Sequence, residues 1–113
     1  MTASQLLSTD EVPPRERGPA WCEWVYRHFG GLGSDLYGDE VPFDGHLAAS
    51  RAGDVILTRL EANRHRVLRT AQMARLSDAA YLKIVAPWQG SAEVVQKGRA
   101  AAVRSGGWTL YDT

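Results

Sequence analysis

Residues 81–88 read Tyr81-Leu82-Lys83-Ile84-Val85-Ala86-Pro87-Trp88, and this stretch decides the predicted fold class. Apolar residues occupy every second position, at 82, 84, 86 and 88. Successive side chains of a β-strand point to opposite faces, so this spacing predicts a strand with one mainly apolar face.

Similar short segments follow one another from Gly45 onward. Turn residues separate them, most clearly at Ala52-Gly53-Asp54, Ser77-Asp78, Lys97-Gly98 and Ser105-Gly106-Gly107. Short strands at this spacing are typical of an antiparallel sandwich or barrel. The predicted strands are His46–Arg51, Val55–Ala62, His65–Met73, Tyr81–Trp88, Ala92–Gln96, Ala100–Arg104 and Trp108–Asp112.

The part of the chain before Gly45 has a different pattern. Residues 1–18 are polar and show no periodicity, which predicts a flexible leader outside the core. Residues 19–29 predict one short helix, because Trp21 and Val25 fall on one helical face and Gly30-Gly31 ends the pattern. Residues 32–45 are rich in Gly and Asp and predict a loop.

Composition limits the class of protein. The chain has 113 residues, of which 44% are hydrophobic and 23% charged, with 13 basic and 13 acidic side chains and one cysteine. This length supports one small globular domain, and a single cysteine forms no internal disulfide. No stretch reaches the roughly 20 apolar residues of a membrane span or resembles a signal peptide, so we expect a cytoplasmic protein without membrane contact.

The residues typical of metal and nucleophilic sites are scattered. The three histidines, His28, His46 and His65, have no metal-ligand spacing, and Cys22 lies among aromatic residues on the predicted helix. No catalytic motif is present, so we expect neither an enzyme nor a metal or other cofactor.

The neutral total hides an uneven distribution of charge. Residues 1–44 hold 8 acids and 3 bases, whereas residues 45–113 hold 5 acids and 10 bases. Arginines gather between residues 51 and 75, where three interpretations stay open: a solvated sheet face, a contact to an anionic or polar ligand inside a barrel, or a DNA-contacting patch. Trp88 and Trp108 are interpreted as core residues or as pocket walls.

The order of several segments resembles the N-terminal domain of AraC-type bacterial transcription regulators. The similarity covers about residues 19–113, beginning with the helix that contains Trp24 and Phe29. The later segments that carry it are 45–55, 58–62, 65–70, 77–84, 97–99 and 108–113. One turn differs, since Ser105-Gly106-Gly107 stands where the family commonly has Pro-Gly-Asp.

The resemblance implies a mainly β, cupin-like antiparallel barrel or jelly roll that senses a small effector and helps the regulator to dimerise. In this family a separate C-terminal domain binds DNA through helix-turn-helix units. The chain ends at Thr113, before the rest of the barrel and that domain, so we expect an incomplete barrel without its DNA-binding part.

Effector-binding residues vary within the family, so the candidates rest on residue chemistry and strand direction. We expect Arg59, His65 and Arg69 as polar contacts and Trp88 and Trp108 as pocket walls. Two other functions stay open: an interaction module that pairs through an open sheet edge, and a cupin-type enzyme, against which the absence of a His-x-His motif argues.

Overall fold

The computed structural model describes residues 5–38, 43–76, 82–96 and 98–112. The chain divides into two compact units, Met1–Ser77 and Asp78–Thr113. The predicted turn at Ser77-Asp78, together with Tyr81, lies outside the described residues.

A three-stranded antiparallel sheet forms one layer of the first unit. Its strands are β1 (Gln5–Ser8), β3 (Gly45–Ala52) and β4 (Val55–Ala62), in the order β1-β3-β4. The two-residue turn between β3 and β4 places Gly53 at a positive φ of 60°, a conformation that glycine adopts without strain. The predicted strands at 46–51 and 55–62 are therefore confirmed as one hairpin.

The N-terminal segment belongs to this sheet, so the prediction of a leader outside the core is wrong for the described residues from 5 onward. Leu7 of β1 pairs with Leu47 of β3, and two short 3-10 helices follow at Thr9–Glu11 and Pro14–Glu16. Thr9 is fully buried, and its hydroxyl oxygen accepts a hydrogen bond from the backbone N–H of Gly45 at 2.9 Å. A four-residue strand is too short to show a reliable period in the sequence.

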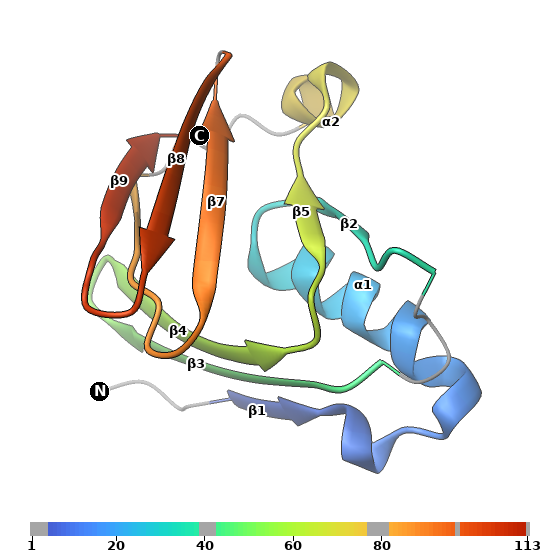
Figure 1. The fold of residues 1–113 in the computed structure, drawn as a ribbon. Helices are drawn as coiled ribbons and strands as arrows, with labels where there is room; N and C mark the ends of the chain where they lie inside the picture. Colours follow the sequence, from blue (N-terminus) through green and yellow to red (C-terminus); the bar gives the residue numbers. More distant parts are fainter. Residues whose placement is uncertain (1–4, 39–42, 77–81, 97, 113) are drawn as a thin grey trace. The chain divides into compact units, whose positions relative to one another are not determined.

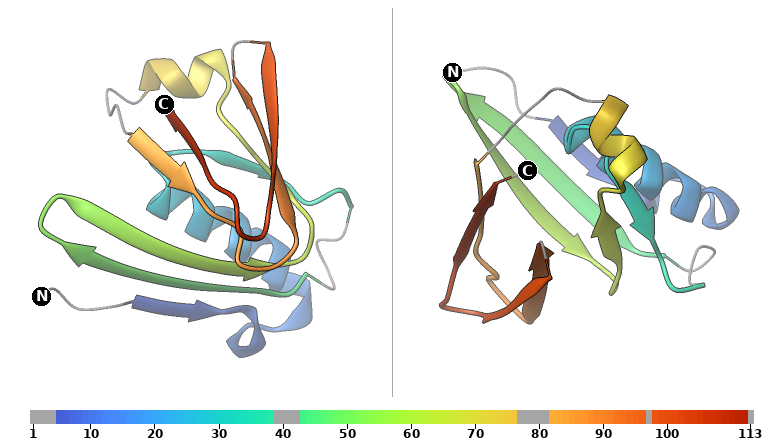
Figure 2. Two further views of the ribbon diagram at one scale, coloured as in Figure 1. Left: turned by 60° about the vertical axis from the view of Figure 1, so that its left-hand side comes forward. Right: turned by 90° about the horizontal axis from the view of Figure 1, so that it is seen from above.

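The predicted helix is present as α1 (Arg17–His28), two residues earlier at its start than expected. Its buried residues Trp21 and Val25 pack against Leu47 in a core completed by Leu32, Leu36 and Phe43. Figures 1 and 2 show α1 on one side of the three-stranded sheet. Among the described residues, no helix has the length and apolar character to cross a membrane.

A short two-stranded sheet lies on the same side of the three-stranded sheet as α1 (Figure 1). It pairs β2 (Gly33–Asp35) with β5 (Arg66–Leu68), although residues 32–45 were expected to be a loop. The predicted strand over 65–73 is also too long, because α2 (Ala71–Leu76) begins there. The Thr70 side chain caps α2 by accepting a hydrogen bond from the N–H of Met73 at 3.1 Å.

The described residues of the second unit form two antiparallel strand pairs. In one, β6 (Leu82–Val85) pairs with β9 (Thr109–Asp112), and in the other β7 (Ser91–Gln96) pairs with β8 (Arg99–Arg104). Val103 of β8 is buried, and burial raises the pKa of the Tyr111 phenol on β9. The protein is thus mainly β with antiparallel sheets, as expected, and the described strands form no closed barrel.

Replacing Thr9 by Val tests whether the N-terminal segment is part of the core. The substitution leaves the buried N–H of Gly45 without its acceptor, so we expect the free energy of unfolding to fall by about 1–3 kcal/mol. Chemical denaturation measures this loss. Thr70→Val removes a bond of the same type at an exposed site, where water replaces the hydroxyl, and should cost less than about 1 kcal/mol. Equal losses would contradict a special role for Thr9.

Candidate functional site

His65 lies in the first unit, against its aromatic core. The ring of this partly buried residue makes edge-to-face contacts with Trp21 and Phe43, at centroid distances of 5.5 and 5.7 Å. Its Nδ1 lies 2.9 Å from the carbonyl oxygen of Asn63. Trp21 also has an edge-to-face contact with Trp24, which lies on α1 like Trp21 itself. The structure therefore places His65 beside α1, although the sequence predicted no such contact.

Arg69 directly follows β5, and we expect strand alternation to continue to it. Val67 of β5 pairs with Ser34 of β2 and lies on the same face of the sheet, and continued alternation would place His65 and Arg69 on that face as well. We call it the inner face of β2–β5, because His65 contacts Trp21, although Val67 is 40% exposed. Two of the three predicted polar contacts, His65 and Arg69, are thus expected on one face.

Arg59 lies elsewhere in the first unit. On the β3–β4 hairpin, Leu60 pairs with the buried Leu47, whereas Arg59 pairs with Ala48 and points to the opposite face, away from α1. There Arg59 donates a hydrogen bond to the Glu61 carboxylate at 3.2 Å. Arg59 therefore lies on the outer face of the hairpin, whereas His65 contacts Trp21 in the core. The structure does not bring these two residues together.

A shallow depression of about 390 Å³ lies around Arg59 on this outer face. His46, whose Nε2 is 3.9 Å from an Asp10 carboxylate oxygen, is one of the residues that line it. Charges of both signs and apolar side chains share its lining, so it has no single chemical preference. The residues that line it from the outer face are Leu6, Ser8, His46, Ala48, Arg59 and Glu61.

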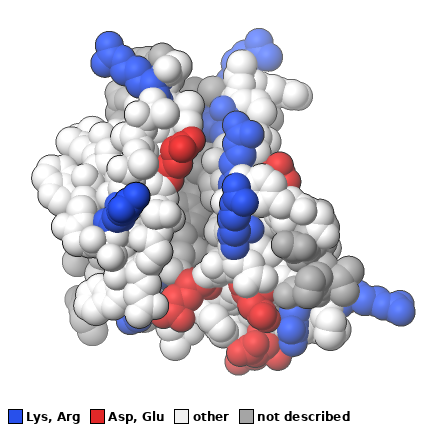
Figure 3. Space-filling view, viewed as in Figure 1, with Lys and Arg blue, Asp and Glu red and all other residues white. Residues whose placement is uncertain are grey.

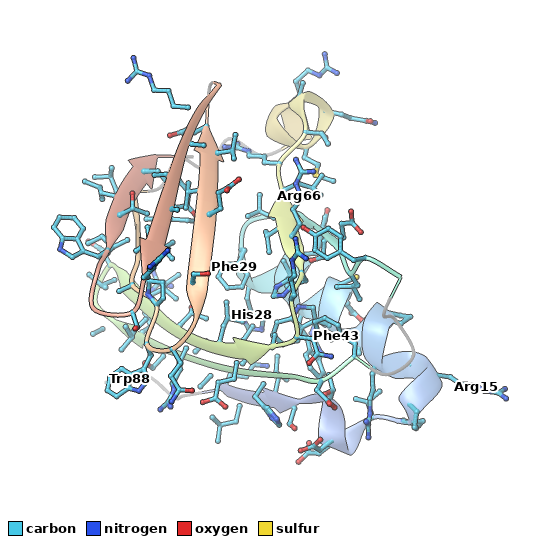
Figure 4. The ribbon with its side chains drawn as sticks, in the orientation of Figure 1. Arg15, His28, Phe29, Phe43, Arg66 and Trp88 are labelled. Carbon is cyan, nitrogen blue, oxygen red and sulfur yellow. The ribbon has the colours of Figure 1, made fainter. Side chains whose placement is uncertain are left out.

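Both predicted pocket tryptophans belong to the second unit and are exposed. Trp88, which is labelled in Figure 4, is 84% exposed, and Trp108 is 66% exposed, so their interpretation as core residues is wrong. The face of β6 that carries Leu82 and Ile84 is exposed as well. An alternating pattern identifies an apolar face but does not show what covers it. The role of Trp88 and Trp108 as pocket walls stays a prediction.

Three buried polar atoms have no hydrogen-bond partner within the part of the chain that the structure describes: Trp21 Nε1, His28 Nε2 and Ser34 Oγ. Buried polar groups are nearly always hydrogen-bonded, so each of these atoms is a candidate ligand contact. Trp21 and His28 are seven residues apart and share one face of α1, which contacts β2. His28 and Ser34 were not among the residues predicted from the sequence; the i,i+7 spacing of Trp21 and His28 was the available signal for His28.

We take four residues near the inner face of β2–β5 as candidate ligand contacts: Ser34 of β2, His65 and Arg69 beside β5, and His28 on the helix that contacts β2. We call them the inner-face polar group. Together they offer a hydroxyl, two imidazoles and a guanidinium, which suit hydrogen bonding to a polar or anionic small molecule. The described residues hold no group of three or more His, Cys, Asp or Glu arranged for a metal ion.

The family to which this chain is similar agrees with a fold built mainly of antiparallel strands. The sequence model of the AraC-binding-like domain family matches residues 21–113, which include most of α1 and all later elements. This chain therefore belongs to the AraC-binding-like domain family, the N-terminal sensing domains of AraC-type regulators.

One curated relative also matches. It is the "Uncharacterized protein in nit 5'region" of Bacillus sp. (strain OxB-1), which is 25% identical over 108 residues. The match covers 96% of this chain but only 42% of that protein, so the chain spans less than half of its relative's length. No solved structure matches this chain.

Removing the Ser34 hydroxyl tests whether it is unpartnered. We expect Ser34→Ala to leave the free energy of unfolding unchanged or to raise it by up to about 1 kcal/mol, because no intramolecular hydrogen bond is lost. Ser8→Ala is the matched control. It removes an acceptor for the Asp10 N–H and should lower stability by about 0.5–1 kcal/mol. A loss larger for Ser34→Ala than for Ser8→Ala in urea titrations would show that the hydroxyl has a partner.

Proposed function

We propose that this chain is the effector-sensing part of an AraC-type bacterial transcription regulator in the cytoplasm. The observation that carries this proposal is the family match over residues 21–113. In the proposed regulator, DNA is bound by a separate helix-turn-helix domain, and the activity of this chain is binding rather than catalysis. Membrane contact forms no part of the proposal.

The proposed effector contacts come from the inner-face polar group. Arg69 supplies a guanidinium for a carboxylate or phosphate, and His65 adds a ring nitrogen beside the core aromatic residues Trp21 and Phe43. His28 and Ser34 offer buried polar atoms that an effector can satisfy. A small anion with an apolar body, such as an aromatic or aliphatic carboxylic acid, has the matching chemistry.

Arg59 allows a direct comparison with Arg69, because it was predicted as a ligand contact too but lies on the outer face of the β3–β4 hairpin. A panel of small carboxylic acids and phosphates is titrated into the protein while tryptophan emission is recorded. Trp21 lies 5.5 Å from the His65 ring and is expected to report binding at the inner face. For an acid that binds, we expect Arg69→Ala to weaken binding by about tenfold or more, since a hydrogen bond to a charged group contributes roughly 1.5–3 kcal/mol.

Arg59→Ala is the matched control and should leave the affinity unchanged. The reverse result, with Arg59→Ala weakening binding and Arg69→Ala neutral, would move the site to the outer-face depression. If no acid in the panel binds, or if neither substitution changes binding, the inner-face proposal is wrong.

A second candidate function is pairing between two copies, which the second unit favours. Leu82, Ile84 and Leu110 share one face of the β6–β9 pair by register, and all three are exposed, as is Trp108 just before β9. Contiguous exposed apolar residues of this kind mark interaction surfaces. The proposed oligomer is a homodimer formed through this face, in line with the dimerising role that the family resemblance implies.

Light scattering after size exclusion tests the pairing. We expect the protein to elute as a dimer and Ile84→Lys to elute as a monomer, because a charge at the centre of an apolar interface is desolvated without a partner. Val95→Lys places the same charge on an exposed apolar position of β7 and should leave the dimer intact. A monomeric parent protein at high concentration, or dissociation by both substitutions, would contradict pairing through β6–β9.

A further inference from the structure

Exposed arginines gather along the segment that contains β5 and α2. The run from residue 64 to residue 76 contains four arginines and no acidic residue. Arg64 lies in the bend before β5 and Arg66 is the first residue of β5, and both side chains are exposed. Figure 3 shows basic side chains following β5 toward α2, which carries Arg75. We call Arg64, Arg66 and Arg75 the basic stripe.

The basic stripe differs from three other arginines of the first unit, which form ion pairs. Arg17, Arg27 and Arg59 each form an ion pair with a carboxylate. Within the part of the chain that the structure describes, Arg64, Arg66 and Arg75 form no such pair, and all three are exposed. None of the three guanidinium groups therefore lies within ion-pair distance of a described carboxylate.

Tyr37 holds one member of the stripe in place without neutralising it. The Arg64 guanidinium carbon lies 5.0 Å from the centre of the Tyr37 ring, a cation–π contact that leaves the N–H groups available. Tyr37 has a φ of 57° and donates its backbone N–H to Asp35 Oδ1 at 3.0 Å. This bond uses one oxygen of Asp35, the acidic residue that faces Arg66 across the β2–β5 register. Arg64 is thus held against the Tyr37 ring while its side chain stays exposed to solvent.

We propose that the basic stripe holds the phosphate backbone of a DNA duplex while the regulator is bound to its operator. This inference rests on the proposed function only for the presence of DNA near this unit. A planar guanidinium matches phosphate geometry, and unpaired arginines gain the most from a polyanion because counterions are released. Sequence is not read here, since α2 has only six residues and the contacts go to the backbone.

Weak contacts are sufficient for this role. A sensing unit joined to a DNA-bound domain by a short flexible linker meets the duplex at a millimolar effective concentration. A few phosphate contacts then determine where the unit lies along the duplex without supplying much affinity on their own. An acidic protein surface is the competing partner for the same charges, and the experiment separates the two.

The test measures binding of the protein to a fluorescent DNA duplex of mixed sequence by anisotropy, between about 20 and about 150 mM salt. We expect salt-dependent, sequence-independent binding. The triple variant R64Q/R66Q/R75Q should bind at least tenfold more weakly at the lowest salt. Its slope of log affinity against log salt should be shallower by about 2–3, since each arginine–phosphate contact contributes roughly 0.9.

Two further triple variants serve as controls. R15Q/R27Q/R51Q removes the same charge elsewhere in the first unit and should keep the parent slope; Figure 4 shows Arg15 at the far end of this unit from Arg66. R64K/R66K/R75K keeps the charge and should retain most of the slope, which separates lost charge from lost folding. Circular dichroism of each variant accompanies the titrations.

Three results would overturn the proposal: no binding to DNA at the lowest salt, the same slope for the stripe and control triple variants, or equal or tighter binding of polyglutamate of matched charge. The last result would assign the stripe to an acidic protein. The effector titration with Arg69→Ala contains no DNA, so failure of the sensing function and failure of the DNA contact are seen separately.

Discussion

The contact between Trp21 and Gly45 is the constraint on which the first unit depends. A Cβ atom at position 45 would lie 2.6 Å from Cε3 of Trp21, closer than real contacts allow, so only glycine lets the indole lie on the start of β3. The N–H of the same glycine is bound by Thr9. Helix α1, strand β3 and the N-terminal segment therefore meet at Gly45. Next to it, the ring centroids of Phe43 and Trp21 are 5.5 Å apart.

Sequence periodicity predicted the parts of this fold that are long enough to show a period. The β3–β4 and β7–β8 hairpins and helix α1 follow their predicted ranges closely, because alternation and turn glycines mark them clearly. Strands β1 and β2 have four and three residues and are defined by their pairing partners, which a local pattern does not contain. Alternation also identified the apolar face of β6 without showing that it is exposed.

The candidate site was predictable only in part, for the same reason. Residue chemistry selected His65, Arg69 and Arg59 as polar candidates, but it did not show which face of each strand is turned to the core. The deciding fact is the pairing of Leu60 with Leu47, which turns Arg59 outward. Ser34 and His28 were missed because their importance comes from burial without a hydrogen-bond partner, a property of packing rather than of residue type.

Strand β5 has only three residues, and the two proposed sites meet at it. His65 and Arg69, proposed to contact an effector, flank the strand, whereas Arg66, proposed to contact phosphate, is its first residue. Because these side chains share five consecutive residues of backbone, the position of the effector contacts and that of the Arg66 guanidinium depend on the same short segment.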